Sequence, residues 1–155
     1  MKAGKEHNEF RGKRASIEDC RAALQDAGLK ATHQRLIIFR TLLNFDGHPD
    51  AESIHAALKE ENPTLSLGTI YRTLEAFVQA GLLSRFTGEE GRMRFDTNLE
   101  PHHHLICNTS ARILDYDDQE LNQLIKDYFR RKPIDGFDVE SFQLHIHGNS
   151  RQDYD

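Results

Sequence analysis

Apolar residues recur at helical spacing through the first half of the chain, up to about residue 81. The clearest stripe follows the i, i+4, i+7, i+8 spacing of one helix face and consists of Ile70, Leu74, Phe77 and Val78. Residues that favour helix caps and breaks, such as Ser, Gly and Pro, separate the apolar segments. The pattern predicts four helices, at about 16–27, 32–44, 51–62 and 66–80.

Strand patterns follow these helices. LLSRF and RMRFD flank TGEEG and predict a hairpin. PHHHLIC, ARILDY and FDVESFQLHIHG have strand-like patterns, and a helix is expected over 118–131 between the second and the third. The fold class is therefore α+β. We expect an N-terminal winged helix-turn-helix domain and a small C-terminal α/β dimerisation domain.

The expected organisation is a flexible arm at 1–15, a winged-helix domain at 16–96, a dimerisation domain at 97–148 and a tail at 149–155. A helix-turn-helix followed by a hairpin is typical of a winged helix. The pattern alone equally fits a small helical bundle with an additional hairpin. The second domain is small to stand alone, and its exposed strand edge and apolar helix face favour a homodimer.

The helix expected at 66–80 carries polar groups off its apolar stripe. Thr69, Tyr71 and Arg72 lie in its first turns, where a recognition helix reads base edges. The alternative is that Tyr71 packs on a neighbouring helix and Arg72 is solvated. We add Arg14, Arg35 and Ser66 to the expected DNA-contacting residues.

The distribution of charge also differs between the two expected domains. The net charge of −5 argues weakly against nucleic-acid binding. Residues 1–40, however, hold nine Lys or Arg against five Asp or Glu, whereas residues 96–155 hold six against twelve. The locally basic N-terminal part fits DNA contact. No apolar run is long enough for a signal peptide or a membrane span, so we expect a cytoplasmic protein without a membrane partner.

The three adjacent histidines of PHHHLIC do not form one cluster. Residues i and i+2 of a strand share a face, so His102 and His104 can converge while His103 points away. Asp96 and Asp115 lie close by in sequence, at the ends of expected strands. Two imidazoles and two carboxylates suit Fe²⁺, Mn²⁺ or Zn²⁺. A solvated polyhistidine run is the alternative, and a mononuclear metal enzyme with a two-histidine, one-carboxylate site is a remote one.

Four segments, in order, resemble the ferric uptake regulator (Fur) family of metal-dependent repressors. ATHQRLIIF resembles the family's T-x-Q-R opening of its second helix, and GHPDAESIHAAL its H-x-x-A-E segment. LSLGTIYRTLEAFVQAGLL is similar to its recognition-helix signature, and RMRFD followed by HHHLIC to the start of its dimerisation domain. The resemblance spans roughly residues 16–148 and implies a DNA-binding repressor that is not an enzyme.

The resemblance also implies a regulatory metal site. Its ligands would be His48, Asp96, His102, His104 and Asp115. The implied ion is Fe²⁺ or Mn²⁺, with Zn²⁺ also suited, and it would clamp both domains for binding to a palindromic double-stranded operator.

Two aspartates in this ligand set resemble the peroxide-responsive (PerR-like) branch. In that branch, iron-catalysed oxidation modifies ligating histidines, here His48 and His102. An iron-responsive or zinc-responsive repressor without peroxide chemistry is the alternative.

The chain departs from the family at its cysteines. Most members hold a structural zinc with two C-x-x-C pairs, but this chain has only Cys20 and Cys107. We therefore expect no four-cysteine zinc site and interpret Cys107 as a buried apolar residue. A second family site uses the middle histidine, here His103, with a last-strand histidine whose position is Phe142 here.

Overall fold

The computed structural model describes residues 14–88 and 91–151. These form two compact units, an N-terminal unit up to Glu100 and a C-terminal unit from Pro101 onwards. The expected arm, apart from Arg14 and Ala15, and the end of the expected tail lie outside the described residues.

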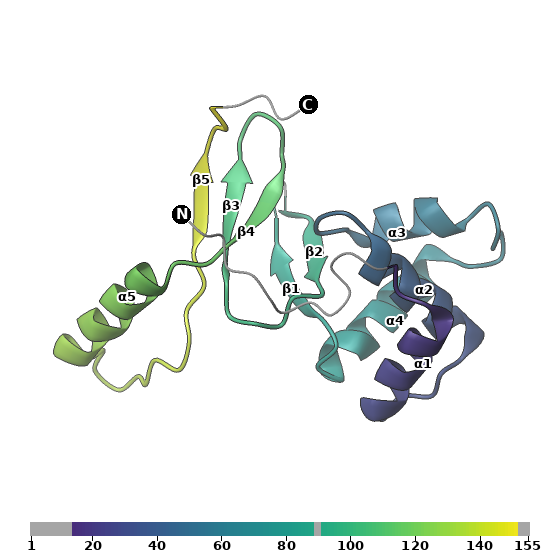
Figure 1. Ribbon diagram of the computed structural model, residues 1–155, viewed down its shortest axis with the longest axis horizontal. Helices are drawn as coiled ribbons and strands as arrows, with labels where there is room; N and C mark the ends of the chain where they lie inside the picture. The colour runs from purple at the N-terminus through teal and green to yellow at the C-terminus, as the bar shows by residue number, and fades with distance from the viewer. Residues whose placement is uncertain (1–13, 89–90, 152–155) are drawn as a thin grey trace. The chain divides into compact units, whose positions relative to one another are not determined.

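The N-terminal unit contains four helices and a hairpin, shown in purple to teal in Figure 1. Its elements are α1 (Ile17–Asp26), α2 (His33–Asn44), α3 (Ala51–Leu58), α4 (Leu67–Gln79), β1 (Ser84–Thr87) and β2 (Met93–Asp96). The expected helices and hairpin are confirmed, although α3 ends at Leu58 and not at residue 62 as expected. The fold is thus the predicted winged helix-turn-helix, not a bundle with an additional hairpin.

Polar caps explain where these helices begin. Ser16 and Asp19 form a reciprocal capping box at α1, which satisfies two backbone N–H groups. The side chains of Thr32, Asp50 and Ser66 cap the starts of α2, α3 and α4. Each accepts a hydrogen bond from the backbone N–H of the residue three positions further along the chain. Asp50 directly follows His48 and Pro49, so this cap fixes the end of the loop that carries His48.

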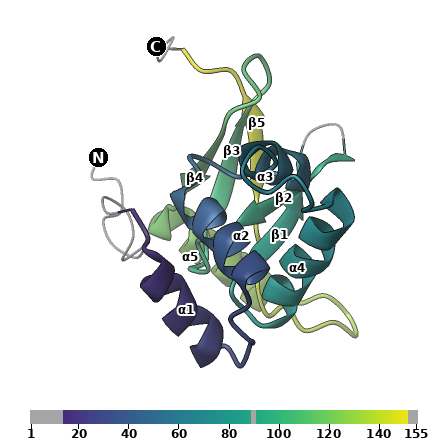
Figure 2. The ribbon, with the colours of Figure 1, turned by 90° about the vertical axis from the view of Figure 1, so that its right-hand side faces the viewer.

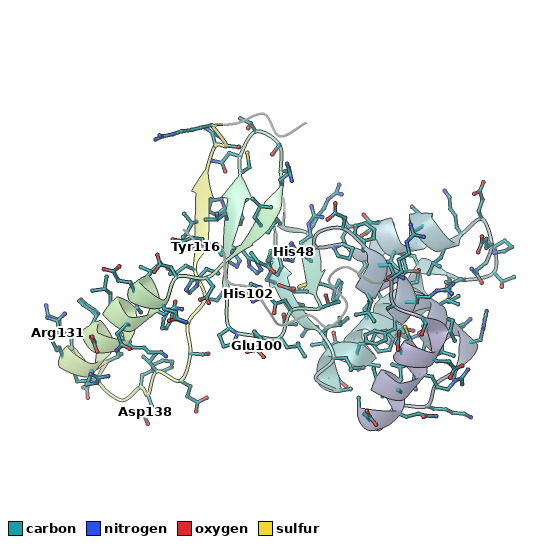
Figure 3. The ribbon with its side chains drawn as sticks, in the orientation of Figure 1. His48, Glu100, His102, Tyr116, Arg131 and Asp138 are labelled. Carbon is teal, nitrogen blue, oxygen red and sulfur yellow. The ribbon has the colours of Figure 1, made fainter. Side chains whose placement is uncertain are left out.

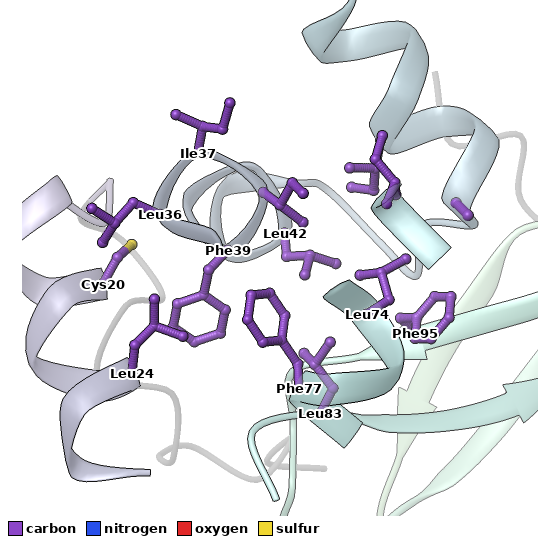
Figure 4. Close-up of a cluster of buried hydrophobic side chains, with 14 of the residues drawn as sticks. Cys20, Leu24, Leu36, Ile37, Phe39, Leu42, Leu74, Phe77, Leu83 and Phe95 are labelled. Carbon is purple, nitrogen blue, oxygen red and sulfur yellow. The ribbon is translucent and has the colours of Figure 1, made fainter. Parts of the chain in front are cut away.

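The core of the N-terminal unit lies around α2, which packs against α1, α3 and α4. Figure 2 shows α2 between α1 and α4. The stripe predicted on α4 is buried at Ile70, Leu74 and Phe77. The rings of Phe77 and Phe39 of α2 meet edge to face, with centroids 5.3 Å apart. Figure 4 shows the two rings side by side. This packing leaves the opposite face of α4 to solvent.

The C-terminal unit is a three-stranded sheet with one helix. Its elements are β3 (His103–Cys107), β4 (Ile113–Tyr116), α5 (Gln119–Arg131) and β5 (His145–Gly148). The sheet order is β4-β3-β5, with β4 antiparallel and β5 parallel to β3. Figure 1 shows β3 between its two neighbours. Together the two units confirm the α+β fold class.

Helix α5 carries a pronounced apolar stripe, yet none of its residues is buried. Leu124 is 61% and Tyr128 is 48% exposed. Figure 3 labels Arg131 at the end of α5, Tyr116 before its start and Asp138 in the connection to β5. None of the described helices is long and apolar enough to cross a membrane.

Candidate metal centre

The N-terminal unit brings together His48 and Asp96, which are far apart in sequence. His48 Nε2 lies 3.4 Å from Asp96 Oδ2. The other carboxylate oxygen of Asp96 accepts the backbone N–H of Asn98 at 2.9 Å. One oxygen is therefore used to orient the carboxylate, and the other faces the imidazole.

Backbone hydrogen bonds hold the His48 loop against β2. The N–H of Phe95 donates to the carbonyl of Pro49 at 3.0 Å. Arg94 Nη1 donates to the carbonyl of His48 at 3.1 Å, and the Phe86 ring lies 5.5 Å from the imidazole, edge to face. The loop is thus attached to the wing strand whose last residue is Asp96. We call His48 and Asp96 the N-terminal half-site.

The C-terminal unit assembles a second group, His102, His104 and Asp115. In the antiparallel β3–β4 ladder, His104 is directly paired with Asp115. His102 Nε2 and His104 Nε2 lie 3.4 Å and 3.8 Å from Asp115 Oδ1, and 3.1 Å from each other. His102, labelled in Figure 3, is held by Gln143, which donates to its carbonyl at 3.1 Å. We call these three residues the C-terminal half-site.

The spacing of these three atoms fits a single ion. Ligand atoms bound to one metal at roughly 2.0–2.2 Å lie about 3–3.5 Å apart, as these nitrogens and this oxygen nearly do. Two imidazoles and a carboxylate form the facial set that non-thiolate sites use for Fe²⁺, Mn²⁺ or Zn²⁺. The C-terminal half-site can therefore hold three positions of such an ion and leaves others to be filled.

His103 points to the opposite face of the sheet, as the strand period predicts. Its Nδ1 accepts the backbone N–H of Leu144 at 3.1 Å, so its Nε2 carries the proton and donates to Asn122 Oδ1 of α5. Phe142 stacks on the ring with centroids 5.7 Å apart. Both nitrogens are thus engaged in hydrogen bonds in this arrangement. A second metal site at His103 stays a prediction.

Cys107 ends β3 and is half-buried, so the expectation of a buried apolar residue is wrong. Hydrogen bonds from the hydroxyls of Ser110 and Thr109, with backbone N–H groups, lower the pKa of the Cys107 thiol to about 6. Burial instead raises the pKa of Cys20, in the helical core, to about 11. With two cysteines, the chain has no four-cysteine zinc site.

Three of the expected DNA-contacting residues meet at the start of α4. Ser66 Oγ accepts the backbone N–H of Thr69 at 3.1 Å and lies 2.9 Å from its hydroxyl. Arg72 Nη2 donates to the same Thr69 hydroxyl at 3.3 Å. Ser66 and Arg72 are exposed, so this turn presents hydroxyl and guanidinium groups to solvent.

The other three make no hydrogen bond with these groups. Tyr71 is 43% exposed, and its hydroxyl donates to Glu52 of α3 at 2.9 Å. The contact with Glu52 could not be predicted from the sequence, because residue spacing does not show which side chains pair across helices. Arg35 Nη1 donates to the carbonyl of Lys30 at 3.0 Å, and Arg14 is exposed.

A winged helix-turn-helix whose α4 has an exposed face, together with imidazole and carboxylate half-sites, is the arrangement expected of a metal-responsive DNA-binding regulator. The chain belongs to the ferric uptake regulator family, which it matches over residues 26–147. It is accordingly a metal-dependent, DNA-binding repressor and not an enzyme. Proteins of this family bind operator DNA as dimers.

Curated proteins and solved structures that are similar to this chain include three regulators. The peroxide-responsive repressor PerR of Staphylococcus aureus is 33% identical over 132 residues, which cover 85% of this chain and 87% of the relative. The Fur structure from Vibrio cholerae is 28% identical, with a TM-score of 0.69 over 84% of this chain and 98% of that one. Fur from Pseudomonas aeruginosa, solved with manganese, is 27% identical, with a TM-score of 0.68 over 86% of this chain and 98% of that one.

The two thiols should differ sharply in reactivity. We expect Cys107 of the folded protein to react with iodoacetamide at pH 7, with a rate that rises through about pH 6 as its thiolate forms. Cys20 should react only after unfolding, because it is buried and its pKa is raised. Mass spectrometry of alkylated peptides measures both rates. Equal labelling of the two cysteines in the native protein would contradict this assignment.

Proposed function

We propose that this chain is a peroxide-responsive repressor whose two half-sites bind one Fe²⁺ ion, or Mn²⁺ in its place. The ligands would be His48, Asp96, His102, His104 and Asp115. The observation that carries the proposal is that each unit independently presents imidazole and carboxylate atoms at ligand spacing. Neither group alone fills the five or six positions such an ion prefers.

A shared ion would couple metal binding to DNA binding. An ion that uses ligands from both units favours the arrangement in which all five ligands meet, and shifts the population toward it by its differential affinity. Two negatively charged carboxylates with neutral imidazoles balance a divalent ion. Loss of the ion would return the units to independent motion and weaken operator binding.

DNA recognition would use the exposed start of α4. Thr69, Tyr71 and Arg72 would enter the major groove, and Ser66, Arg35 and Arg14 would contact the backbone or bases nearby. Hydroxyl and guanidinium groups at the start of α4 are the types that bind phosphates and guanine edges. The operator would be a palindrome read by two copies of the chain, in the cytoplasm.

The C-terminal unit would supply the homodimer interface. Leu124, Tyr128, Ile134 and Phe137 are all exposed, and Phe137 is 64% exposed. A cavity of about 490 Å³ opens between α5 and the segment that follows it, lined partly by Phe129 and Phe142. Exposed large apolar side chains gathered on one unit are typical of a protein contact. Because there is no structural zinc of four cysteines, apolar packing would hold the dimer.

Peroxide would act on the ligating histidines. Bound iron supplies one-electron chemistry toward peroxide. Overall, one peroxide molecule transfers an oxygen atom to the ring carbon of His48 or His102 and leaves as water. An oxidised ring no longer donates well to the ion, so the repressor would release DNA. Aspartate at both carboxylate positions, and the similarity to the Staphylococcus aureus repressor, support this signal.

An iron-responsive or zinc-responsive repressor is the second candidate. The same five ligands suit Zn²⁺ and reversible Fe²⁺ binding. The likeness to the two Fur structures favours it. In that case, dissociation of the ion, and no oxidation, would release the DNA.

Removing a ligand from either unit should have the same consequence. We expect His48→Gln and His104→Gln each to weaken Mn²⁺ affinity by at least about 100-fold, because each removes a direct ligand. Each should also abolish the Mn²⁺-dependent gain in operator affinity, measured by fluorescence anisotropy on a selected palindromic duplex. His33→Gln, an exposed change on α2, is the matched control. Full metal-dependent binding by His48→Gln would exclude a site shared between units.

Changing the reading helix should separate DNA binding from metal binding. We expect Arg72→Ala to weaken operator binding by about 1–3 kcal/mol while leaving Mn²⁺ affinity unchanged. Arg112→Ala removes the same charge from an exposed position in the C-terminal unit and serves as the control. If the two variants bind operator equally well, Arg72 is not a DNA contact.

Peroxide sensing should leave a covalent mark. After Fe²⁺ loading and brief peroxide treatment, we expect peptides containing His48 or His102 to gain one oxygen atom by mass spectrometry. Mn²⁺-loaded protein should remain unmodified, because Mn²⁺ does not carry out this chemistry with peroxide. Intact histidine peptides in protein that still holds iron would support the iron-responsive repressor instead.

A further inference from the structure

Strand β5 carries two histidines that have no place in the five-ligand set. His145 and His147 are two residues apart and therefore share one face of the strand. Both are exposed. Among the described strands, β5 pairs only with β3, so it is an edge strand of the sheet.

The sheet register places this pair beside the C-terminal half-site. In the parallel β3–β5 ladder, His145 is paired with His104 and His147 with Ile106. The rings of His104 and His145 are in contact, with centroids 5.4 Å apart. One face of the sheet thus carries a row formed by His104, His145 and His147.

The pair repeats a spacing that already gathers ligands in this chain. His102 and His104, also separated by one residue, bring their Nε2 atoms within 3.1 Å of each other. Two imidazoles at this spacing on an extended strand can reach one ion, with water at the remaining positions. Neutral imidazoles suit divalent transition ions such as Zn²⁺, Ni²⁺ and Cu²⁺.

We propose that His145 and His147 form a second, exposed metal-binding site that takes a divalent transition ion next to His104. The site requires only the C-terminal unit and is independent of the regulatory function proposed above. It is also distinct from the predicted site at His103, whose side chain lies on the other face of the sheet. Because it has only two ligands and both are exposed to solvent, this site should bind metal more weakly than the five-ligand site.

Zinc stoichiometry tests this proposal directly. Full-length protein is dialysed to equilibrium against Zn²⁺, and bound zinc per chain is measured by elemental analysis. The wild type should hold one more zinc ion per chain than His145→Gln/His147→Gln, in which glutamine keeps a polar side chain without imidazole. His33→Gln should hold as much zinc as the wild type. The difference between wild type and double variant is informative even if the five-ligand site binds nothing.

A residue-level readout identifies the ligands. In NMR spectra recorded during the zinc titration, the ring Cε1–H signals of both His145 and His147 should shift together in the weaker binding step. Each single variant, His145→Gln or His147→Gln, should lose that step. Equal zinc content in wild type and double variant would overturn the proposal. So would a titration in which only one of the two rings responds.

Discussion

A divalent transition ion needs about five or six ligand atoms, and among the residues that the structure describes neither unit offers that many at one place. The N-terminal half-site presents one imidazole and one carboxylate, and the C-terminal half-site two imidazoles and one carboxylate. Each is incomplete, and the ligands of each are positioned by hydrogen bonds within their own unit. The proposed regulation depends on this division, because an ion bound by a single unit could not report to the other.

Contacts within its own unit position the ligands of each half-site. The N-terminal half-site depends on the backbone bond from Phe95 to Pro49, which fastens a loop to the wing strand. The C-terminal half-site depends on the pairing of His104 with Asp115 across β3 and β4. Prepared ligands lose less conformational entropy when the ion binds, so more of the binding energy is available for joining the units.

The helices and the histidine geometry could be predicted because they depend on local rules. Ser16 and Ser66 mark helix starts by cap chemistry, and the strand period separates His103 from His102. The position of His48 could not be derived this way, because a long-range backbone bond sets it; only the family resemblance indicated it. The parallel pairing of β5 with β3, which puts His145 beside His104, has no signal in spacing. The prediction that Cys107 is buried is also wrong. Its thiol faces the hydroxyls of Thr109 and Ser110 in the turn after β3, and the apolar residues before it in the sequence do not indicate this.

The distance between the two units with and without the ion tests the central claim most directly. Spin labels at Lys59→Cys and Arg131→Cys, in a Cys107→Ser background diluted with unlabelled protein, report one exposed position in each unit. Buried Cys20 should stay unlabelled. Pulsed electron–electron double resonance should give a broad distribution of label-to-label distances without metal and one narrow distribution with Zn²⁺ bound. The same distribution in both states, with zinc bound at the five ligands, would contradict a metal clamp between the units.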